Sequence, residues 1–307
     1  MKGYKGFNEG LVCRGKQYAE NTIFEEEKAV ICHSGMHFCE NPLDVLDHYP
    51  LLNDNGELNE FAEVEALAKV HTDYKKKYTT TKLRIGAKLS FAGFVKASVD
   101  FMLLTCGKAK NKDSAQMASS GYYAKMASSG DSEQMASSGD YAQMASSGYS
   151  AQMASSGDYA QMASSSYSAK MASSGDSAQM ASSSYSAQMA SSGDYAKMAS
   201  SGYYAKMASS GDYAKMASSG DYAKMASSGD SEQMASSGKN SVVAAIGYNS
   251  IAKAEKGSWI TLAEWVCDDE GNLIPALVKT RKVDGKHIKA DTWYKLKNGK
   301  FEVVNDE

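Results

Sequence analysis

The residues best suited to bind a metal ion lie near the start of the chain. Cys32, His37 and Cys39 fall close together, and Cys13 precedes them. Thiolate and imidazole groups are the ligands of structural zinc sites, although the spacing here is not a CxxC pair. Cysteine and histidine are also common in protein cores. These four residues are therefore an alternative metal site, while the leading interpretation is that they are structural and that the chain uses no metal or cofactor.

A second set, Arg14, His37 and Glu65, could do different chemistry. Arg14 precedes a glycine, His37 lies in the segment GMHF and Glu65 in the segment EVE. This order resembles ADP-ribosyltransferases, although their Ser-Thr-Ser element is missing. The resemblance implies that such residues bind a nicotinamide dinucleotide and stabilise a developing oxocarbenium ion. They are the catalytic set of an alternative, enzymatic interpretation, whereas the leading interpretation assigns no catalytic residue.

The middle of the chain repeats a nine-residue unit, and the fold of this unit determines where any binding residues in it lie. Methionine recurs every nine residues from 117 to 234 without slippage. Alternation along a strand places Ala142, Met144 and Ser146 on one face and Gln143 on the other. Lys or Gln always occupies the Gln143 column, so that face is predicted to be solvated and the other buried. A fixed period of this kind predicts a repeat fold rather than a disordered tract.

The residue four positions before each methionine predicts how many units form one coil. In the middle of the array this residue alternates between Asp and Tyr, so the structural period is eighteen residues. The prediction is a flattened β-roll of seven coils, roughly 34 Å long at a strand spacing of about 4.8 Å. Two candidate binding ladders would lie on opposite edges: Asp140, Asp158, Asp176, Asp194, Asp212 and Asp230 on one, and Tyr149, Tyr167, Tyr185 and Tyr203 on the other.

The array divides the chain into three predicted parts, and the fold class is mainly β. Residues 1–105 form an α+β domain, with Asn41 as the N-cap of a short helix and strands in FAEVEALAKVH and TTTKLRIGAKL. Residues 106–257 form a parallel β-solenoid of nonapeptide repeats, two per coil, with regular repeats at 113–238. Residues 258–307 form a small antiparallel β cap, whose turns contain DEGN, DG and NG.

Two resemblances bear on this interpretation. The stretch SVVAAIGYNS resembles coils of the left-handed β-roll in YadA-like bacterial adhesin heads; it supports a roll and implies no adhesion. The segments CRGKQY and GMHFCENPLDV, the Ser/Ala-rich repeats and the closing SWITLAEW and DTWYKL are together similar to a family of uncharacterised phage and prophage proteins. In that family the repeat number varies between two constant ends, and the resemblance implies no activity.

Charge and composition disfavour several function classes. The net charge of −3 divides into +1 for residues 1–112 (16 basic, 15 acidic), −5 for 113–238 (6 basic, 11 acidic) and +1 for 239–307 (11 basic, 10 acidic). Since no segment is strongly basic, direct nucleic-acid binding is not expected. No apolar run reaches the length of a membrane span or a signal segment, and the cysteine count of five is odd. We therefore expect a cytoplasmic protein without membrane contact, in the host cell if phage-encoded.

The leading hypothesis for function is a non-enzymatic, phage-type binding or scaffold protein. The Asp and Tyr ladders would be bound by a protein partner, such as a host defence or regulatory factor, or by a second copy of the chain. One alternative is an ADP-ribosyltransferase-like enzyme in the first domain with the roll as a spacer. Another is a DNA mimic that inhibits a host nucleic-acid-binding protein. The structural interpretation of the ladders is that Asp shapes turns and Tyr covers coil edges.

Overall fold

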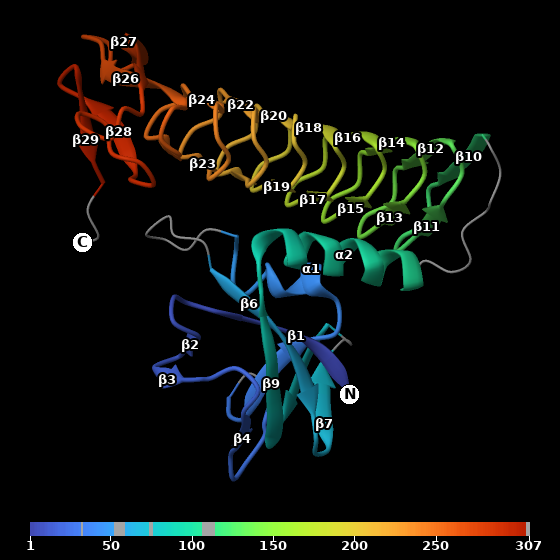
Figure 1. Ribbon diagram of the computed structural model, residues 1–307. Helices are drawn as coiled ribbons and strands as arrows, with labels where there is room; N and C mark the ends of the chain where they lie inside the picture. The colour runs from blue at the N-terminus through green and yellow to red at the C-terminus, as the bar shows by residue number, and fades with distance from the viewer. Residues whose placement is uncertain (32, 52–58, 74–75, 106–113, 305–307) are drawn as a thin grey trace. The chain divides into compact units, whose positions relative to one another are not determined.

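The computed structural model describes residues 1–31, 33–51, 59–73, 76–105 and 114–304 (Figure 1). The chain divides into two compact units, Met1–Phe101 and Met102–Glu307. The first is built on an antiparallel sheet, and the second contains the repeats. Within the described ranges, no helix is both long and apolar enough to cross a membrane.

The described residues of the first unit form nine strands. They are β1 (Lys2–Phe7), β2 (Val12–Cys13), β3 (Lys16–Gln17), β4 (Ile23–Glu25), β5 (Met36–Cys39), β6 (Glu60–Ala66), β7 (Val70–Asp73), β8 (Lys77–Thr80) and β9 (Lys82–Leu89). Seven of them pair in the order β4-β9-β6-β1-β5-β8-β7, and β2 pairs with β3 in a separate hairpin. The predicted strand in TTTKLRIGAKL is β9. The predicted strand in FAEVEALAKVH is β6, whose neighbour is β9, and the end of that segment begins β7.

Two helices complete this unit among the described residues. Helix α1 (Pro42–Val45) begins as predicted, because the Asn41 side chain accepts a hydrogen bond from the backbone N–H of Leu43 at 3.0 Å. Helix α2 (Phe91–Thr105) follows β9 almost directly. The largest fully buried side chains of the unit are Phe7, Met36, Leu43, Leu51, Leu83, Ile85 and Phe94.

The second unit is a parallel β-roll with two sheets. The first roll sheet contains β10 (Ser114–Ser119), β12 (Ser132–Ser137), β14 (Ser150–Ser155), β16 (Ser168–Ser173), β18 (Ser186–Ser191), β20 (Lys206–Ser209), β22 (Lys224–Ser227) and β24 (Val242–Ala245). The second roll sheet contains β11 (Lys125–Ser128), β13 (Gln143–Ser146), β15 (Gln161–Ser164), β17 (Gln179–Ser182), β19 (Lys197–Ser200), β21 (Lys215–Ser218), β23 (Gln233–Ser236) and β25 (Ile251–Ala254). Because each coil contributes one strand to each sheet, β24 and β25 add an eighth coil to the seven predicted.

Neighbouring strands of the roll pair in register, with each residue opposite its equivalent eighteen positions on. Met135 pairs with Met153 in the first roll sheet, and Met144 pairs with Met162 in the second. The predicted β-roll with two nine-residue units per coil is therefore confirmed. Identical side chains can stack along its whole length because the register does not change.

Methionine forms the centre of the roll core. The thirteen methionines from 126 to 234 are all buried. In β14, Ala151, Met153 and Ser155 point inward and are buried, whereas Gln152 is exposed. The inward face is therefore the predicted one. The second roll sheet departs from the prediction that the Gln/Lys column is solvated, since Gln161 and Gln179 are only 6% and 4% exposed. Burial of a methionine side chain contributes about 1.5–3 kcal/mol, so the stacked column can support a core that is only one large side chain thick.

The last part of the chain forms the predicted small antiparallel β cap, which consists of two hairpins. The first hairpin is β26 (Trp259–Cys267) with β27 (Leu273–Lys282), and the second is β28 (Tyr294–Lys297) with β29 (Lys300–Val303). β26 pairs with β24 and β28 pairs with β25, so each hairpin continues one roll sheet. They thereby cover the strand edges that the last coil would otherwise expose, which is a common protection against edge-to-edge aggregation.

Candidate functional site

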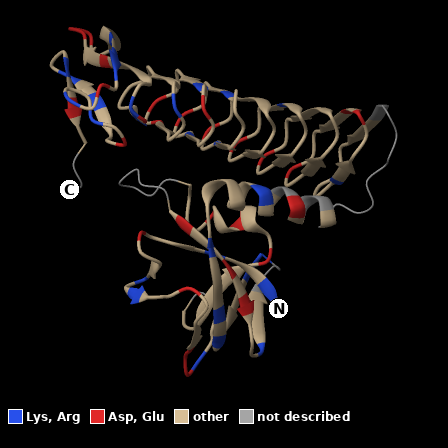
Figure 2. Cartoon of the chain, in the orientation of Figure 1, with Lys and Arg blue, Asp and Glu red and all other residues tan. Residues whose placement is uncertain are grey.

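The two predicted ladders lie on opposite edges of the roll. The chain passes from the first to the second roll sheet through turns that we call the Asp edge, which contain Asp140, Asp158, Asp176, Asp194, Asp212 and Asp230. It returns through turns that we call the Tyr edge, which contain Tyr149, Tyr167, Tyr185 and Tyr203. Figure 2 shows acidic residues recurring from coil to coil. The alternation in sequence therefore predicted the placement of both ladders.

The carboxylates of the Asp edge bind the backbone of the next coil. Oδ1 of Asp140 accepts a hydrogen bond from the N–H of Asp158 at 3.0 Å, and the same bond recurs at 2.8–2.9 Å up to Asp230. In return, the N–H of Tyr141 donates to the carbonyl of Asp158 at 2.8 Å. Hydrogen bonds to charged groups contribute about 1.5–3 kcal/mol each. The Asp ladder thus has a structural role, because it satisfies turn N–H groups that lie outside the sheets.

The tyrosines of the Tyr edge form an uninterrupted stack. Ring centroids of Tyr149 and Tyr167 are 5.1 Å apart, and the next two steps, to Tyr185 and Tyr203, are 5.2 and 5.6 Å. The ring planes deviate from parallel by only 7–12°. Their exposed fractions are 62%, 51%, 44% and 37% along the row. The stack therefore presents a continuous aromatic strip to solvent.

A second row of tyrosines lies on the Asp edge, and the sequence interpretation missed it. Tyr141 and Tyr159 stack at 4.9 Å, and Tyr195 and Tyr213 stack at 5.1 Å, while Ser177 occupies the position between the two pairs. The sequence contains a signal for this row, because each of these tyrosines stands three positions before a methionine and directly after an Asp of the Asp edge. The φ angles of the four tyrosines are positive, between 56° and 58°, and that of Ser177 is 56°.

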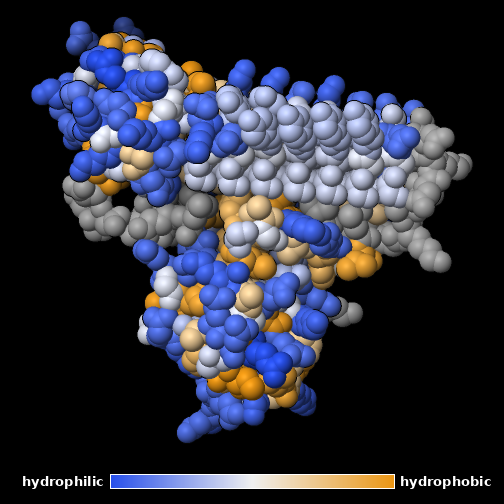
Figure 3. Space-filling view, viewed as in Figure 1, coloured by the Kyte–Doolittle hydropathy of each residue, from blue (hydrophilic) through white to orange (hydrophobic). Residues whose placement is uncertain are grey.

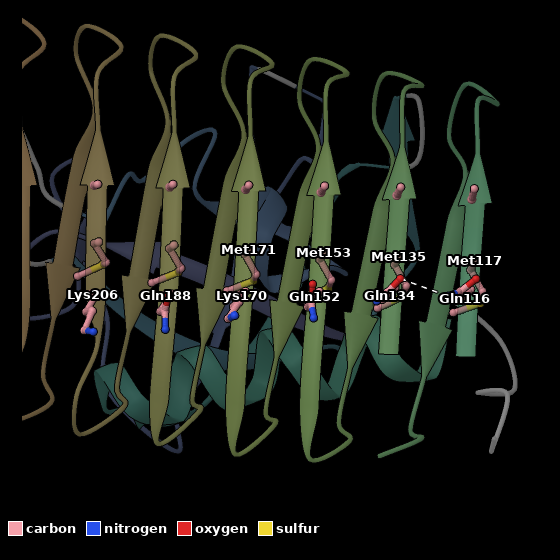
Figure 4. Close-up of a pocket in the computed structure, with 18 residues that line it drawn as sticks. Gln116, Met117, Gln134, Met135, Gln152, Met153, Lys170, Met171, Gln188 and Lys206 are labelled. Carbon is pink, nitrogen blue, oxygen red and sulfur yellow. Dashed lines mark hydrogen bonds between the residues drawn. The ribbon is translucent and has the colours of Figure 1, made fainter. Parts of the chain in front are cut away.

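The outer face of the first roll sheet carries parallel columns of small and polar side chains. The Gln/Lys column and the neighbouring Ala column border a trough of about 810 Å³, lined along six coils (Figure 4). Gln116 donates to Gln134 at 3.4 Å along the first column. Figure 3 shows the flank of the roll as regular rows of similar side chains. The described lining contains no acid, cysteine or histidine, and its charged residues are Lys170 and Lys206.

A pocket in the first unit brings together reactive side chains from distant parts of the chain. Its volume is about 480 Å³, and its lining includes Lys5, Cys13, Arg14, His37 and Tyr49. Lys5 Nζ donates to Cys13 Sγ at 3.2 Å, and Tyr49 Oη donates to the same sulfur at 3.0 Å. Lys5 Nζ also donates to the carbonyl of His37 at 3.0 Å. β1, β2 and the segment after α1 position this cluster, which the sequence interpretation did not anticipate.

The candidate catalytic set is only partly assembled. Arg14 and His37 both line the pocket, but Glu65 lines a different cavity and pairs with Arg84 at 3.4 Å. The acids that line the pocket with Arg14 and His37 are instead Glu26 and Asp47. Glu26 accepts hydrogen bonds from Lys16 Nζ at 2.8 Å and from the N–H of Gly35 at 3.0 Å. Burial, with Lys77 and Lys5 nearby, lowers the pKa of His37 to about 4, so this imidazole is neutral at pH 7.

The candidate zinc set is also only partly visible in the structure. Cys13, His37 and Cys39 line the same pocket, and Cys32 lies outside the described residues. Among the described residues, no group of three or more Cys, His, Asp and Glu side chains has metal-binding geometry. Burial raises the pKa of Cys39 to about 12, so its thiol remains protonated at pH 7. Cys13 is engaged with Lys5 and Tyr49.

Two glutamates are buried inside the roll, in a column that otherwise holds alanine. Glu133 and Glu232 stand two positions before a methionine, where the twelve other units have Ala. The hydroxyl of Ser146 donates to Glu133 Oε2. Glu232 is fully buried, and this burial, with Asp212 and Asp230 nearby, raises its pKa from the ordinary 4.5 to about 9. The signal in sequence is the replacement of Ala by Glu in the inward column.

Replacing Glu232 with alanine is expected to stabilise the roll in a pH-dependent way. A carboxyl whose pKa is 4.5 unfolded and about 9 folded stabilises the protein fully below pH 4.5, and this contribution is lost as the pH rises to 9. Glu232→Ala should therefore gain on the order of 1 kcal/mol relative to the unsubstituted chain for each pH unit between about 5 and 9. Urea unfolding at several pH values measures this difference.

The exposed Asp269 provides the matched control for that series. Asp269→Ala removes one acid from the β26–β27 turn and should leave the pH profile of stability unchanged. If Glu232→Ala and the unsubstituted chain differ by the same amount at pH 5 and pH 9, Glu232 does not bind a proton preferentially in the folded state.

Comparison with known proteins bears only on the first unit. Neither the curated proteins nor the solved structures contain a match to the chain. The description of the roll, its ladders and the buried glutamates therefore depends only on the sequence and structure of this chain. Residues 1–97, which contain the sheet, α1 and the Lys5–Cys13–Tyr49 cluster, match the model of a family described as a domain of unknown function, DUF7666.

Proposed function

We propose that this chain is a non-enzymatic binding protein of phage type, in which the Tyr edge of the roll binds a protein partner in the cytoplasm of the host. The observation that carries the proposal is the uninterrupted stack from Tyr149 to Tyr203, with between 37% and 62% of each residue exposed. Tyrosine is enriched in protein interfaces because it combines a large apolar ring with a polar hydroxyl and few rotatable bonds.

The difference between the two edges supports the choice of the Tyr edge. On the Asp edge the carboxylates are engaged with the next coil, and the tyrosine row is interrupted at Ser177. On the Tyr edge the residues that follow Tyr149, Tyr167 and Tyr185 are serines. The acids of the same column, Asp131 and Asp221, stand only at the two ends of the stack. A strip of this kind fits a partner surface with an apolar centre and hydrogen-bond acceptors for the tyrosine hydroxyls.

Replacing the four tyrosines of the Tyr edge with serine is expected to abolish partner binding. The variant carries Tyr149→Ser, Tyr167→Ser, Tyr185→Ser and Tyr203→Ser. Loss of the aromatic anchors should weaken binding at least about a hundredfold, since interface anchors contribute 2 kcal/mol or more each. The measurement is the dissociation constant for the partner identified with the unsubstituted chain, together with sedimentation of the chain alone to detect self-association.

The matched control removes four stacked tyrosines from the other edge. It carries Tyr141→Ser, Tyr159→Ser, Tyr195→Ser and Tyr213→Ser, and serine is already present at the equivalent Ser177. Binding should persist in this variant. Equal loss of binding in both variants would show that exposed tyrosine in general, and not the Tyr edge, causes the interaction.

A further inference from the structure

The Lys5–Cys13–Tyr49 cluster places an amine and a phenol against one sulfur. Lys5 lies on β1 and Cys13 on β2, with 3.2 Å between Nζ and Sγ. Both residues are nearly buried, at 5% and 8% exposure. The sulfur nevertheless lines the pocket of about 480 Å³, which is large enough to admit a small oxidant. The cluster is unrelated to the Tyr edge, and the proposed function does not use it.

The chemistry of the two groups is complementary. Burial lowers the pKa of Lys5, so a larger fraction of its side chain carries the free lone pair of a neutral amine. An oxidised sulfur bound to hydroxyl is an electrophile that condenses with a nearby thiol or nitrogen. Cys39 lines the same pocket, but its pKa of about 12 keeps it a thiol, and a thiol reacts more slowly than a thiolate. Lys5 Nζ is a side-chain nitrogen that already forms a hydrogen bond with Cys13 Sγ.

We propose that Cys13 is a peroxide-sensitive thiol and that Lys5 traps its oxidised form in a covalent sulfur–nitrogen cross-link between β1 and β2. In the first step the sulfur attacks one oxygen of hydrogen peroxide; the O–O bond breaks, sulfenic acid forms and water leaves. In the second step the Lys5 amine attacks that sulfur, the S–O bond breaks and a second water leaves. One thiol, one amine and one peroxide thus give one sulfenamide and two waters. The sulfur is oxidised by two electrons, and the peroxide is reduced.

Peptide mass spectrometry of the full-length chain tests this proposal. The chain is treated with hydrogen peroxide, alkylated and digested with trypsin without reductant. A cross-linked Lys5 resists trypsin, so residues 3–14 should remain one peptide, about 2 Da lighter than its thiol form and not alkylated at Cys13. Dithiothreitol should restore cleavage after Lys5 and alkylation of Cys13. Cleavage that continues after Lys5, with Cys13 still alkylated, carried as sulfinic acid or joined to another cysteine, overturns the proposal.

Two variants distinguish the role of the Lys5 amine from that of the Cys13 thiol. Lys5→Arg keeps a cationic donor beside the sulfur but removes the reactive amine, so Cys13 sulfenic acid should accumulate and be captured by dimedone. Cys267→Ser removes an exposed cysteine from the second unit and should leave the cross-link unchanged. Unchanged dimedone labelling in Lys5→Arg relative to the parent chain would also overturn the role of Lys5. Because the parent chain provides the first test, the conclusion does not depend on the folding of either variant.

Discussion

Replacing Gly193 with alanine is expected to disrupt the roll. Gly193 lies at the Asp edge, and a Cβ atom there would lie 2.1 Å from the carbonyl oxygen and 2.5 Å from the carbonyl carbon of Gly175 in the preceding coil. Both are backbone atoms, so the contact cannot be relieved by rotating a side chain. The turns would have to separate, which would break the 2.9 Å hydrogen bond from the N–H of Asp194 to Asp176. We expect a loss of at least about 3 kcal/mol, in the range of severe core substitutions.

The control introduces alanine at Ser184, the equivalent turn position on the Tyr edge. Ser184 occupies a corner of the Tyr edge nine residues earlier, where the chain already accommodates a Cβ. Ser184→Ala removes only a hydroxyl that lies 3.4 Å from Ser164 Oγ and should cost less than about 1 kcal/mol. Urea unfolding followed by circular dichroism compares the two. Equal stability of Gly193→Ala and Ser184→Ala would mean that the coils are not held at the spacing described here.

Deleting nine residues is expected to destabilise the roll more than deleting eighteen. Removal of 158–175 joins Gly157 to Asp176, so that Asp176 replaces Asp158 above Asp140 and both edges keep their identity. Removal of 158–166 joins Gly157 to Tyr167 instead and turns everything downstream by half a coil. The Tyr149–Tyr167 ring stack is then lost at the junction, and turns of the Asp edge must stack on turns of the Tyr edge. The lost stack alone amounts to about 0.5–1.5 kcal/mol.

Thermal unfolding of the two deletion variants measures the difference, and their binding provides a second readout. The eighteen-residue deletion keeps three consecutive tyrosines of the Tyr edge in one row, whereas the nine-residue deletion moves all but Tyr149 to the opposite edge. If both variants unfold at the same temperature, the two kinds of turn are interchangeable and the Asp ladder does not hold the coils together.

The roll could be predicted in detail because its tertiary contacts repeat its sequence. Each strand pairs with its equivalent eighteen residues away, so a pairing seen between two coils recurs along the roll. The alternation of buried and exposed residues recurs in the first roll sheet, whereas both faces are buried in β15 and β17 of the second. The period of methionine predicted the inward face, and the alternation of Asp and Tyr predicted the edges. The Asn41 cap and the turns of the last hairpins are equally local, since each depends on residues within a few positions.

The chemistry of the first unit was decided only by its tertiary structure. Glu65 was grouped with Arg14 and His37 from chain order, but the sheet order places it at another cavity. Tyr49 reaches Cys13 across 36 residues of chain that contain no repeat.

The Asp carboxylates show the same limit within the roll. Their position was evident from the sequence, but the N–H groups that they accept belong to the next coil and became visible only when the coils were stacked. A periodic sequence predicts which equivalent side chains stack, because each strand pairs with a strand of nearly the same sequence. Contacts between a side chain and a backbone group, or between residues outside the repeats, depend on the folded geometry. That geometry determines the role of the Asp ladder and the assembly of the Lys5–Cys13–Tyr49 cluster.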